Sequence, residues 1–129
     1  MKHEAVTGSV IGAAMAVLNE LRPGLDERLY ERALLLELLA RGHSVDQQCP
    51  FEVHYRNQVV GILVPDLIVD GLVIVDTKVV TAFNDTHLAQ MLGYLAIARL
   101  EVGLLLNVRD VHLQTKRVVR GEAESTLVP

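Results

Sequence analysis

Residues 65–78, which read PDLIVDGLVIVDTK, constrain the fold of this chain more than any other segment. Two apolar runs of strand length flank Asp70-Gly71, a dipeptide that is typical of tight β-hairpin turns. Three ionisable side chains, those of Asp66, Asp76 and Lys78, interrupt the apolar pattern. Burying an ionised side chain is costly unless it is paired, hydrogen-bonded or bound to a metal. The segment therefore predicts two antiparallel strands whose polar groups need a specific explanation.

The strand pattern places two of these side chains together. Asp76 and Lys78 are two residues apart, so both project from one face of a strand while Thr77 projects from the other. The position of Asp66 depends on the register of the hairpin. A two-residue loop places Asp66 opposite Val75 and on the face away from Asp76, whereas a three-residue loop or a bulge pairs Asp66 directly with Asp76. The sequence leaves both registers open.

If the three side chains converge, they form the outline of a phosphodiesterase site. Two adjacent carboxylates repel each other, and a divalent cation such as Mg²⁺ keeps both ionised. Such a metal lowers the pKa of a bound water, while Lys78 orients that water or stabilises the developing negative charge. The alternative is an ordinary ion pair between Lys78 and Asp76, with Asp66 bonded to a nearby backbone amide.

The rest of the chain predicts an α+β sandwich of one sheet and flanking helices. Helical spacing of apolar residues occurs at about 4–21, 25–40 and 83–99. Alternating or continuous apolar patterns predict strands at 51–55, 59–69, 72–80, 103–108 and 111–119, with a short turn at Asn57-Gln58. The predicted order is α-α-β-β-β-α-β-β, in one domain over residues 1–129 with a core at about 5–120 and a frayed tail at 121–129.

Composition narrows the possible partners and locations. The formal net charge of −4 excludes a broad basic surface, so any contact with nucleic acid must be local. Half of the residues are hydrophobic, which is compatible with a homodimer that covers some apolar surface. The lone Cys49 and an N-terminus unlike a signal sequence favour a reducing cytoplasm. The early apolar stretch at residues 10–18 is too short to cross a membrane.

Several ordered motifs resemble those of one group of nucleases. GLDERLY at residues 24–30 matches G-x-x-E-x-x-Y, and PD at residues 65–66 followed by DTK resembles P-D-(D/E)-x-K. QMLGY at residues 90–94 matches the Q-x-x-x-Y of exonuclease-like members. GLLLNV at residues 103–108 and KRVV at residues 116–119 look like the closing hairpin of these proteins. Over roughly residues 5–120, the chain resembles the GxxExxY proteins of the PD-(D/E)XK nuclease superfamily.

This resemblance implies a restriction-endonuclease-like fold with a mixed central sheet and with Mg²⁺ or Mn²⁺ in the active site. Asp66 and Asp76 would be metal carboxylates and Lys78 the catalytic lysine. The remaining site residues would be Glu27, an accessory carboxylate that also binds metal, and Gln90 and Tyr94, which would line the site.

Helical spacing is consistent with this assignment, because Glu27 and Tyr30 lie one turn apart, as do Gln90 and Tyr94. The alternatives are a solvated acid for Glu27, a surface amide for Gln90, and core aromatic residues for the two tyrosines. Glu31 is expected on a solvated helix face.

The motif departs from the usual pattern at Asp76, where these proteins usually carry Glu. The carboxylate of Asp76 lies about one methylene further from a fixed metal position, which puts turnover in doubt. The resemblance implies a metal-dependent nuclease acting on DNA, in DNA processing or repair. The alternatives are a non-catalytic module that binds nucleic acid or protein, and a structural homo-oligomer.

Overall fold

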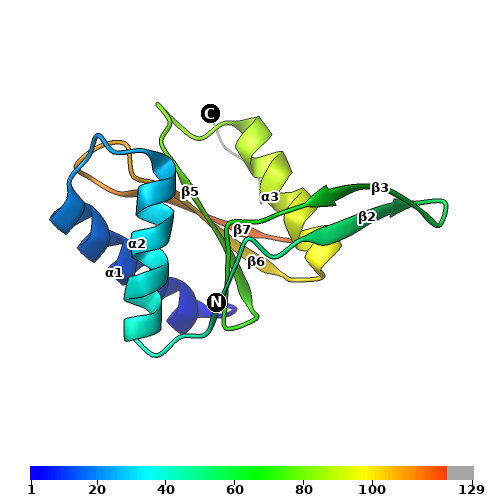
Figure 1. Ribbon diagram of the computed structural model, residues 1–129, viewed down its shortest axis with the longest axis horizontal. Helices are drawn as coiled ribbons and strands as arrows, with labels where there is room; N and C mark the ends of the chain where they lie inside the picture. Colours follow the sequence, from blue (N-terminus) through cyan, green and yellow to red (C-terminus); the bar gives the residue numbers. More distant parts are fainter. Residues whose placement is uncertain (122–129) are drawn as a thin grey trace.

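Two helices at the start of the chain cover one face of a central sheet in the computed structural model, which describes residues 1–121 (Figure 1). Helix α1 spans Glu4–Leu21 and helix α2 spans Glu27–Ala40. The side chain of Asp26 accepts a hydrogen bond of 2.9 Å from the backbone N–H of Arg28 and so satisfies a free donor of the first turn of α2. This cap is why α2 begins two residues later than predicted.

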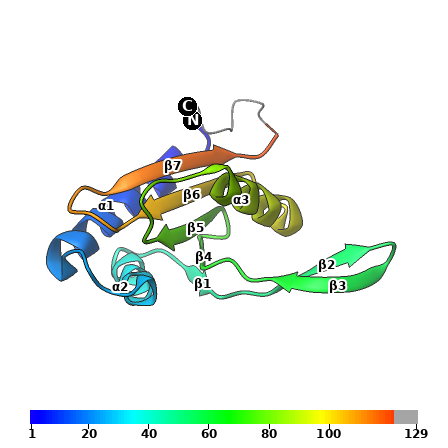
Figure 2. The same cartoon turned by 90° about the horizontal axis from the view of Figure 1, so that it is seen from above.

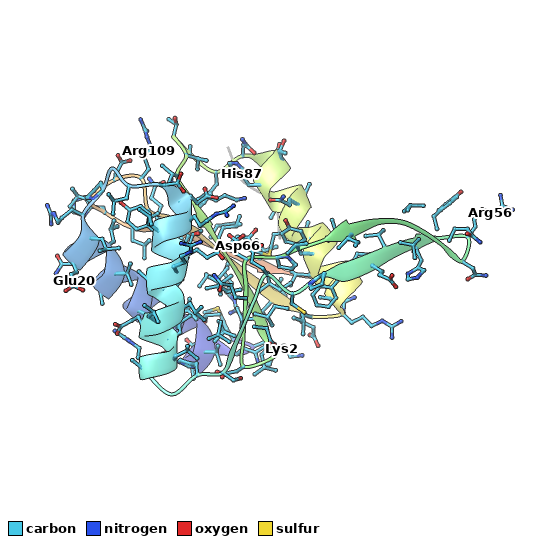
Figure 3. The ribbon with its side chains drawn as sticks, in the orientation of Figure 1. Lys2, Glu20, Arg56, Asp66, His87 and Arg109 are labelled. Carbon is cyan, nitrogen blue, oxygen red and sulfur yellow. The ribbon has the colours of Figure 1, made fainter. Side chains whose placement is uncertain are left out.

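Helix α3, Asp85–Ala98, covers the opposite face of the sheet. Asn84 accepts a hydrogen bond from the backbone N–H of His87, and the His87 ring accepts one from the backbone N–H of Asn84. This reciprocal arrangement satisfies two donors that a helix start leaves free. His87 therefore holds the beginning of α3 (Figure 3).

The central sheet is mixed, as predicted. Across it the strands follow the order β1 (Val45–Gln47), β4 (Leu67–Val69), β5 (Val73–Lys78), β6 (Val102–Asn107) and β7 (Gln114–Val119). Strands β5 and β6 run parallel, and the other neighbours run antiparallel. Strand β6 is buried along its whole length because helices cover both faces of the sheet, which accounts for its continuous apolar run.

Successive side chains of β5 enter the two different layers of the core. Val73 and Val75 pack with α1 and α2, whereas Ile74 packs under α3. In the neighbouring β6, a Cβ at Gly103 would overlap the Met91 side chain of α3, so glycine lets the helix lie close to the sheet. The α+β class and the restriction-endonuclease-like layering are thus confirmed.

The predicted strand over residues 59–69 is wrong, because this segment divides between two sheets. Strand β3, Gln58–Leu63, pairs with β2, Phe51–Tyr55, in a separate two-stranded sheet, whereas β4 joins the central one. The break lies next to Pro65, which has no N–H to contribute to a ladder. The backbone of Asp66 instead bonds the Asp76 carboxylate and the Gln48 N–H.

Smaller corrections concern strand ends. Strand β1 was not predicted, because three residues are too few to show a period. The hairpin turn consists of Arg56 and Asn57, both with positive φ, rather than Asn57-Gln58. Strand β7 begins at Gln114, not at residue 111. Beyond residue 121 the predicted tail lies outside the described residues.

The β2–β3 hairpin projects from the body of the molecule beyond α3 (Figure 2). Phe51 anchors its base against the α3 side of the core. Further out, the hairpin exposes large apolar side chains, those of Tyr55, Val59, Val60 and Ile62. Within residues 1–121, no helix is long and apolar enough to cross a membrane.

Candidate active site

The register of the β4–β5 hairpin brings Asp66 and Asp76 together. Leu67 pairs with Val75 and Val69 pairs with Val73, so the loop contains three residues, and the same register places Asp66 opposite Asp76. Of the two registers that the sequence left open, this is the one that allows a shared site. Figure 3 shows Asp66 near the centre of the molecule, beside α2 and directly before β4.

The carboxylate of each aspartate accepts a hydrogen bond from the backbone at or next to the other aspartate. The backbone N–H of Asp66 donates to Oδ1 of Asp76 at 3.2 Å, and the backbone N–H of Thr77 donates to Oδ2 of Asp66 at 3.3 Å. Asp76 is buried, with 2% of its surface exposed, while Asp66 is half-buried. These bonds hold the two carboxylates side by side. Each bond uses one carboxylate oxygen, and the second oxygen of each aspartate takes no part in them.

Lys78 lies on the same face of β5 as Asp76, as the strand spacing predicted. Its Nζ is 4.0 Å from Oδ2 of Asp76 and donates a hydrogen bond of 3.2 Å to Oε1 of Gln90. The Lys78 side chain is largely buried. Gln90 on α3 is exposed, and its amide oxygen holds the ammonium group near the aspartates through this hydrogen bond.

Helix α2 supplies two further carboxylates, of which the sequence analysis recognised only one. Oε1 of Glu27 accepts a hydrogen bond of 3.0 Å from the backbone N–H of Val79, directly after β5. Glu31, which was expected on a solvated face, is buried with 5% exposed. Its Oε2 accepts hydrogen bonds from the side-chain amides of Gln47 and Gln48 at 3.0 and 2.9 Å. The i,i+4 spacing of Glu27 and Glu31 was the signal that could have identified Glu31.

Burial, together with neighbouring negative charge, raises the pKa of Asp66 to about 7. Burial is the largest cause, and the neighbouring carboxylates of Asp76, Glu31 and Glu27 add to it, while the hydrogen bond from the Thr77 N–H opposes it. A carboxyl group with this pKa is only partly ionised at neutral pH. The metal-free site therefore holds more carboxylates than it can keep charged.

Asp76 and Tyr94 respond to the same cluster. Burial raises the pKa of Asp76, and Glu27 and Glu31 raise it further, whereas the Asp66 N–H and the Lys78 ammonium lower it. Burial, followed by the charges of Asp76 and Asp66, raises the pKa of the Tyr94 phenol. The Tyr94 hydroxyl is thus near enough to both carboxylates to feel their charge.

Tyr30 does not belong to this cluster. Its hydroxyl donates a hydrogen bond to the carbonyl oxygen of Arg22 at 2.5 Å and accepts one from the N–H of Leu25 at 3.1 Å. The ring is 1% exposed and packs with Val17, Leu18 and Val108. Tyr30 is therefore a core aromatic residue and not a residue of the site. Its hydroxyl holds the connection between α1 and α2 through these two hydrogen bonds.

A divalent cation fits the donor set of the site. Among residues 1–121, no three histidine, cysteine, aspartate or glutamate side chains form a complete metal site. Mg²⁺, however, commonly uses one or two carboxylates and takes its remaining ligands from water and phosphate. Asp66 and Asp76 supply these two carboxylates, and a cation would offset the repulsion that raises the pKa of Asp66.

The cluster opens to solvent through a cleft between α2 and the end of the sheet. The cleft has a volume of about 570 Å³, and its lining includes Glu27, Arg28, Glu31, Gln48 and Asp66. Asp66 is therefore accessible from outside, whereas Asp76 lies behind it. A ligand in the cleft would meet carboxylates and the Arg28 side chain together.

Comparison with known proteins agrees with this arrangement. A family model described as the PD-(D/E)XK nuclease superfamily matches residues 4–118. Neither the comparison with curated proteins nor the comparison with solved structures found a match. The matched region contains every helix and nearly every strand described above, including the paired aspartates and Lys78. The chain therefore belongs to the PD-(D/E)XK nuclease superfamily.

Proposed function

We propose that this protein is a metal-dependent nuclease that hydrolyses phosphodiester bonds in DNA at the cleft beside α2. The observation that carries the proposal is the three-residue β4–β5 loop, which pairs Asp66 with Asp76 and adds Lys78 on the same face. A domain that served only as a scaffold would gain nothing from several mutually repelling carboxylates at one cleft.

The two aspartates would bind the metal, which we propose to be Mg²⁺, with Mn²⁺ as a substitute. A metal held there would lower the pKa of a bound water and neutralise charge on the phosphodiester. Glu27 could serve as a further carboxylate from α2, since it is bonded to the backbone that follows Lys78. The proposal predicts that binding of the cation releases the proton that Asp66 holds near neutral pH.

The Lys78 ammonium would orient the attacking water or stabilise the negative charge that develops on the phosphate. Gln90 holds Nζ through its hydrogen bond and so limits the positions that the ammonium can take. Tyr94 would line the site on the α3 side, where the charges of both aspartates reach its hydroxyl. Fixed groups of this kind contribute to rate because they do not need to reorganise during the reaction.

The finer identity of the protein is also part of this proposal. The motif G-x-x-E-x-x-Y supports membership in the GxxExxY family, because its glutamate, Glu27, reaches the site while its tyrosine, Tyr30, braces the start of α2. We propose a single domain, a cytoplasmic location and a role in DNA processing or repair.

A homodimer is supported by the β2–β3 hairpin. Val59, Val60 and Ile62 of β3 are each more than half exposed, and Gln58–Leu63 contains no charged residue. A second copy of this strand would therefore meet no like charge when it packs against the first. Light scattering on the purified protein, with Ile62→Lys as the variant, tests this: the dimer predicts a halved mass for the variant, and a wild-type monomer contradicts it.

The test of activity is cleavage of end-labelled single-stranded and double-stranded DNA in Mg²⁺, in Mn²⁺ and in EDTA. Lys78→Ala and Asp66→Ala are measured beside the wild type after a check of folding by circular dichroism. We expect metal-dependent cleavage by the wild type and its loss in both variants. Cleavage that persists in EDTA or in both variants would contradict the proposal.

The shorter carboxylate of Asp76 favours one second candidate, a nucleic-acid-binding module without turnover. Asp76→Glu separates the two. If the wild type is inactive and Asp76→Glu cleaves, the site is otherwise complete and the native chain is the binding module. If both are inactive while the wild type still binds DNA in a metal-dependent manner, the binding function stands and the nuclease proposal fails.

A further inference from the structure

A second cluster of chemically active side chains lies at the other end of β4 and β5 from the aspartate pair. Ser9 of α1, His43 of the α2–β1 connection and Asp70 of the β4–β5 loop meet there. Ser9 Oγ is 2.7 Å from His43 Nε2, and His43 Nδ1 is 2.6 Å from Asp70 Oδ2. All three residues are partly exposed, so the cluster is open to solvent.

The direction of the proton chain follows from the chemistry of Asp70. The hydrogen bond with His43 is the largest of the effects that lower the pKa of Asp70, so this carboxylate is ionised and can only accept. In the tautomer that fits this contact, Nδ1 of His43 carries the ring proton and donates to Asp70, while Nε2 accepts a hydrogen bond from the Ser9 hydroxyl. A serine hydrogen-bonded to a histidine that a carboxylate orients is the arrangement of an activated nucleophile.

The carboxylate that orients His43 is itself fixed. The backbone N–H of Ser44 donates to Asp70 Oδ1 at 2.9 Å, and the backbone N–H of Asp70 donates to the carbonyl oxygen of Ser44 at 2.8 Å. These two bonds hold the β4–β5 loop against the residue that follows His43. The imidazole therefore has little freedom to turn away from Ser9.

The helix surface beside Ser9 carries a positive charge. Gly12 follows Ser9 by one helical turn. If Gly12 carried a Cβ, that atom would lie 3.2 Å from Nη1 of Arg41. Nε of Arg41 donates to Glu37 at 2.8 Å, which restrains the guanidinium at this place. Since residues i and i+3 share a helix face, the guanidinium lies beside the Ser9 face of α1.

We propose that Ser9 is a nucleophile that takes an acyl group from a small activated carboxylic ester, with His43 as general base and Asp70 as the residue that positions His43. His43 Nε2 removes the Ser9 proton as Oγ bonds to the carbonyl carbon of the ester. The tetrahedral intermediate then expels the alkoxy or aryloxy group, which receives the proton from His43. Arg41 stabilises the negative oxygen of the intermediate.

Water completes the cycle at the same groups. His43 accepts a proton from a water molecule that attacks the acyl carbon, and the carboxylic acid leaves as Ser9 Oγ recovers its proton. The net reaction is hydrolysis of one ester to one acid and one alcohol. The backbone N–H of Ser9 lies within α1 and is used by the helix, so the charge on the intermediate depends on Arg41 and turnover is expected to be slow.

The test compares Ser9 with Ser44, whose hydroxyl contacts the same Asp70 but not His43. The full chain is treated with a fluorophosphonate probe and, separately, with p-nitrophenyl acetate, and the modified residues are identified by mass spectrometry. A general base contributes roughly 10²–10⁴-fold to such a step. We expect Ser9 to be modified at least about 100-fold faster than Ser44.

Two variants complete the test. His43→Gln should reduce the modification of Ser9 to the rate at Ser44, and Arg41→Met should slow it while circular dichroism remains unchanged. Equal modification of Ser9 and Ser44 in the wild type would overturn the proposal without any variant. Fast modification of Ser9 that survives His43→Gln would overturn it as well, since the histidine would then be only a structural bridge.

Discussion

Replacing Asp66 with Asn should stabilise the metal-free protein at pH 8 and have little effect at pH 4. The folded state raises the pKa of Asp66 from 3.8 to about 7, so between these values the folded protein retains a proton that the unfolded chain has lost. The free energy of unfolding therefore falls as the pH rises from about 4 to about 7. Above pH 7 the whole cost of the ionised carboxylate is present.

The size of the effect follows from the pKa values. A change from 3.8 to about 7 corresponds to roughly 4 kcal/mol, at about 1.36 kcal/mol for each pKa unit. Asp66 is only partly buried and lines an open cleft, so solvent screening reduces the figure to about 2 kcal/mol. Asn keeps an oxygen that can accept the hydrogen bond from the Thr77 N–H, so the substitution removes the charge and leaves this contact.

The assay is urea denaturation of the wild type and of Asp66→Asn in EDTA at pH 4 and pH 8. Asp110→Asn, at an exposed residue of the β6–β7 connection, is the control and should change stability equally little at both pH values. Adding Mg²⁺ at pH 8 should stabilise the wild type and not Asp66→Asn. The reasoning fails if Asp66→Asn is less stable than the wild type at pH 8, or if its gain is the same at both pH values.

Three further substitutions test other parts of the structure. Glu31→Gln removes a negative charge that acts on both aspartates and that would attract a cation bound between them, so it should weaken Mg²⁺ binding measured by calorimetry, and unchanged affinity would exclude Glu31 from the site. Tyr30→Phe should lower the free energy of unfolding by about 1 kcal/mol because it loses the hydrogen bonds of the hydroxyl. The cleavage rate should stay the same, and a large loss of rate would mean that Tyr30 belongs to the active site. Gly103→Ala should cost about 1–3 kcal/mol in thermal denaturation because the new methyl group overlaps Met91, and a neutral result would mean that α3 moves freely on the sheet.

Local patterns predicted the helices and the central part of the sheet well. The cap residues Asp26 and Asn84 begin α2 and α3, and the apolar run at β6 identifies a strand buried on both faces. The division of residues 59–69 was missed because both halves have the composition of a strand. The first half joins a separate sheet by pairing with β2, and the second half pairs with β1, which is too short to show a pattern in the sequence.

The residues of the candidate site were likewise predicted only in part from the sequence. The motifs named Asp66, Asp76, Lys78, Glu27, Gln90 and Tyr94, and the structure brings all six to one region, although their catalytic roles stay predictions. Glu31 was assigned to solvent because its neighbours along the helix are charged. Its burial comes from Gln47 and Gln48, which reach it only after the chain folds.

The sequence by itself determined the strand face shared by Asp76 and Lys78, the positions of the helices and the family, because periodicity and motif spacing are local properties. Tertiary structure decided the register that pairs Asp66 with Asp76, since the sequence left a two-residue and a three-residue loop open and the folded chain forms the second. It also decided the meeting of Ser9, His43 and Asp70, which come from three separate segments. The physical reason is the same in both cases: these contacts lie between elements, so no periodicity within one element fixes them, and they form only when helices and strands pack on a common sheet.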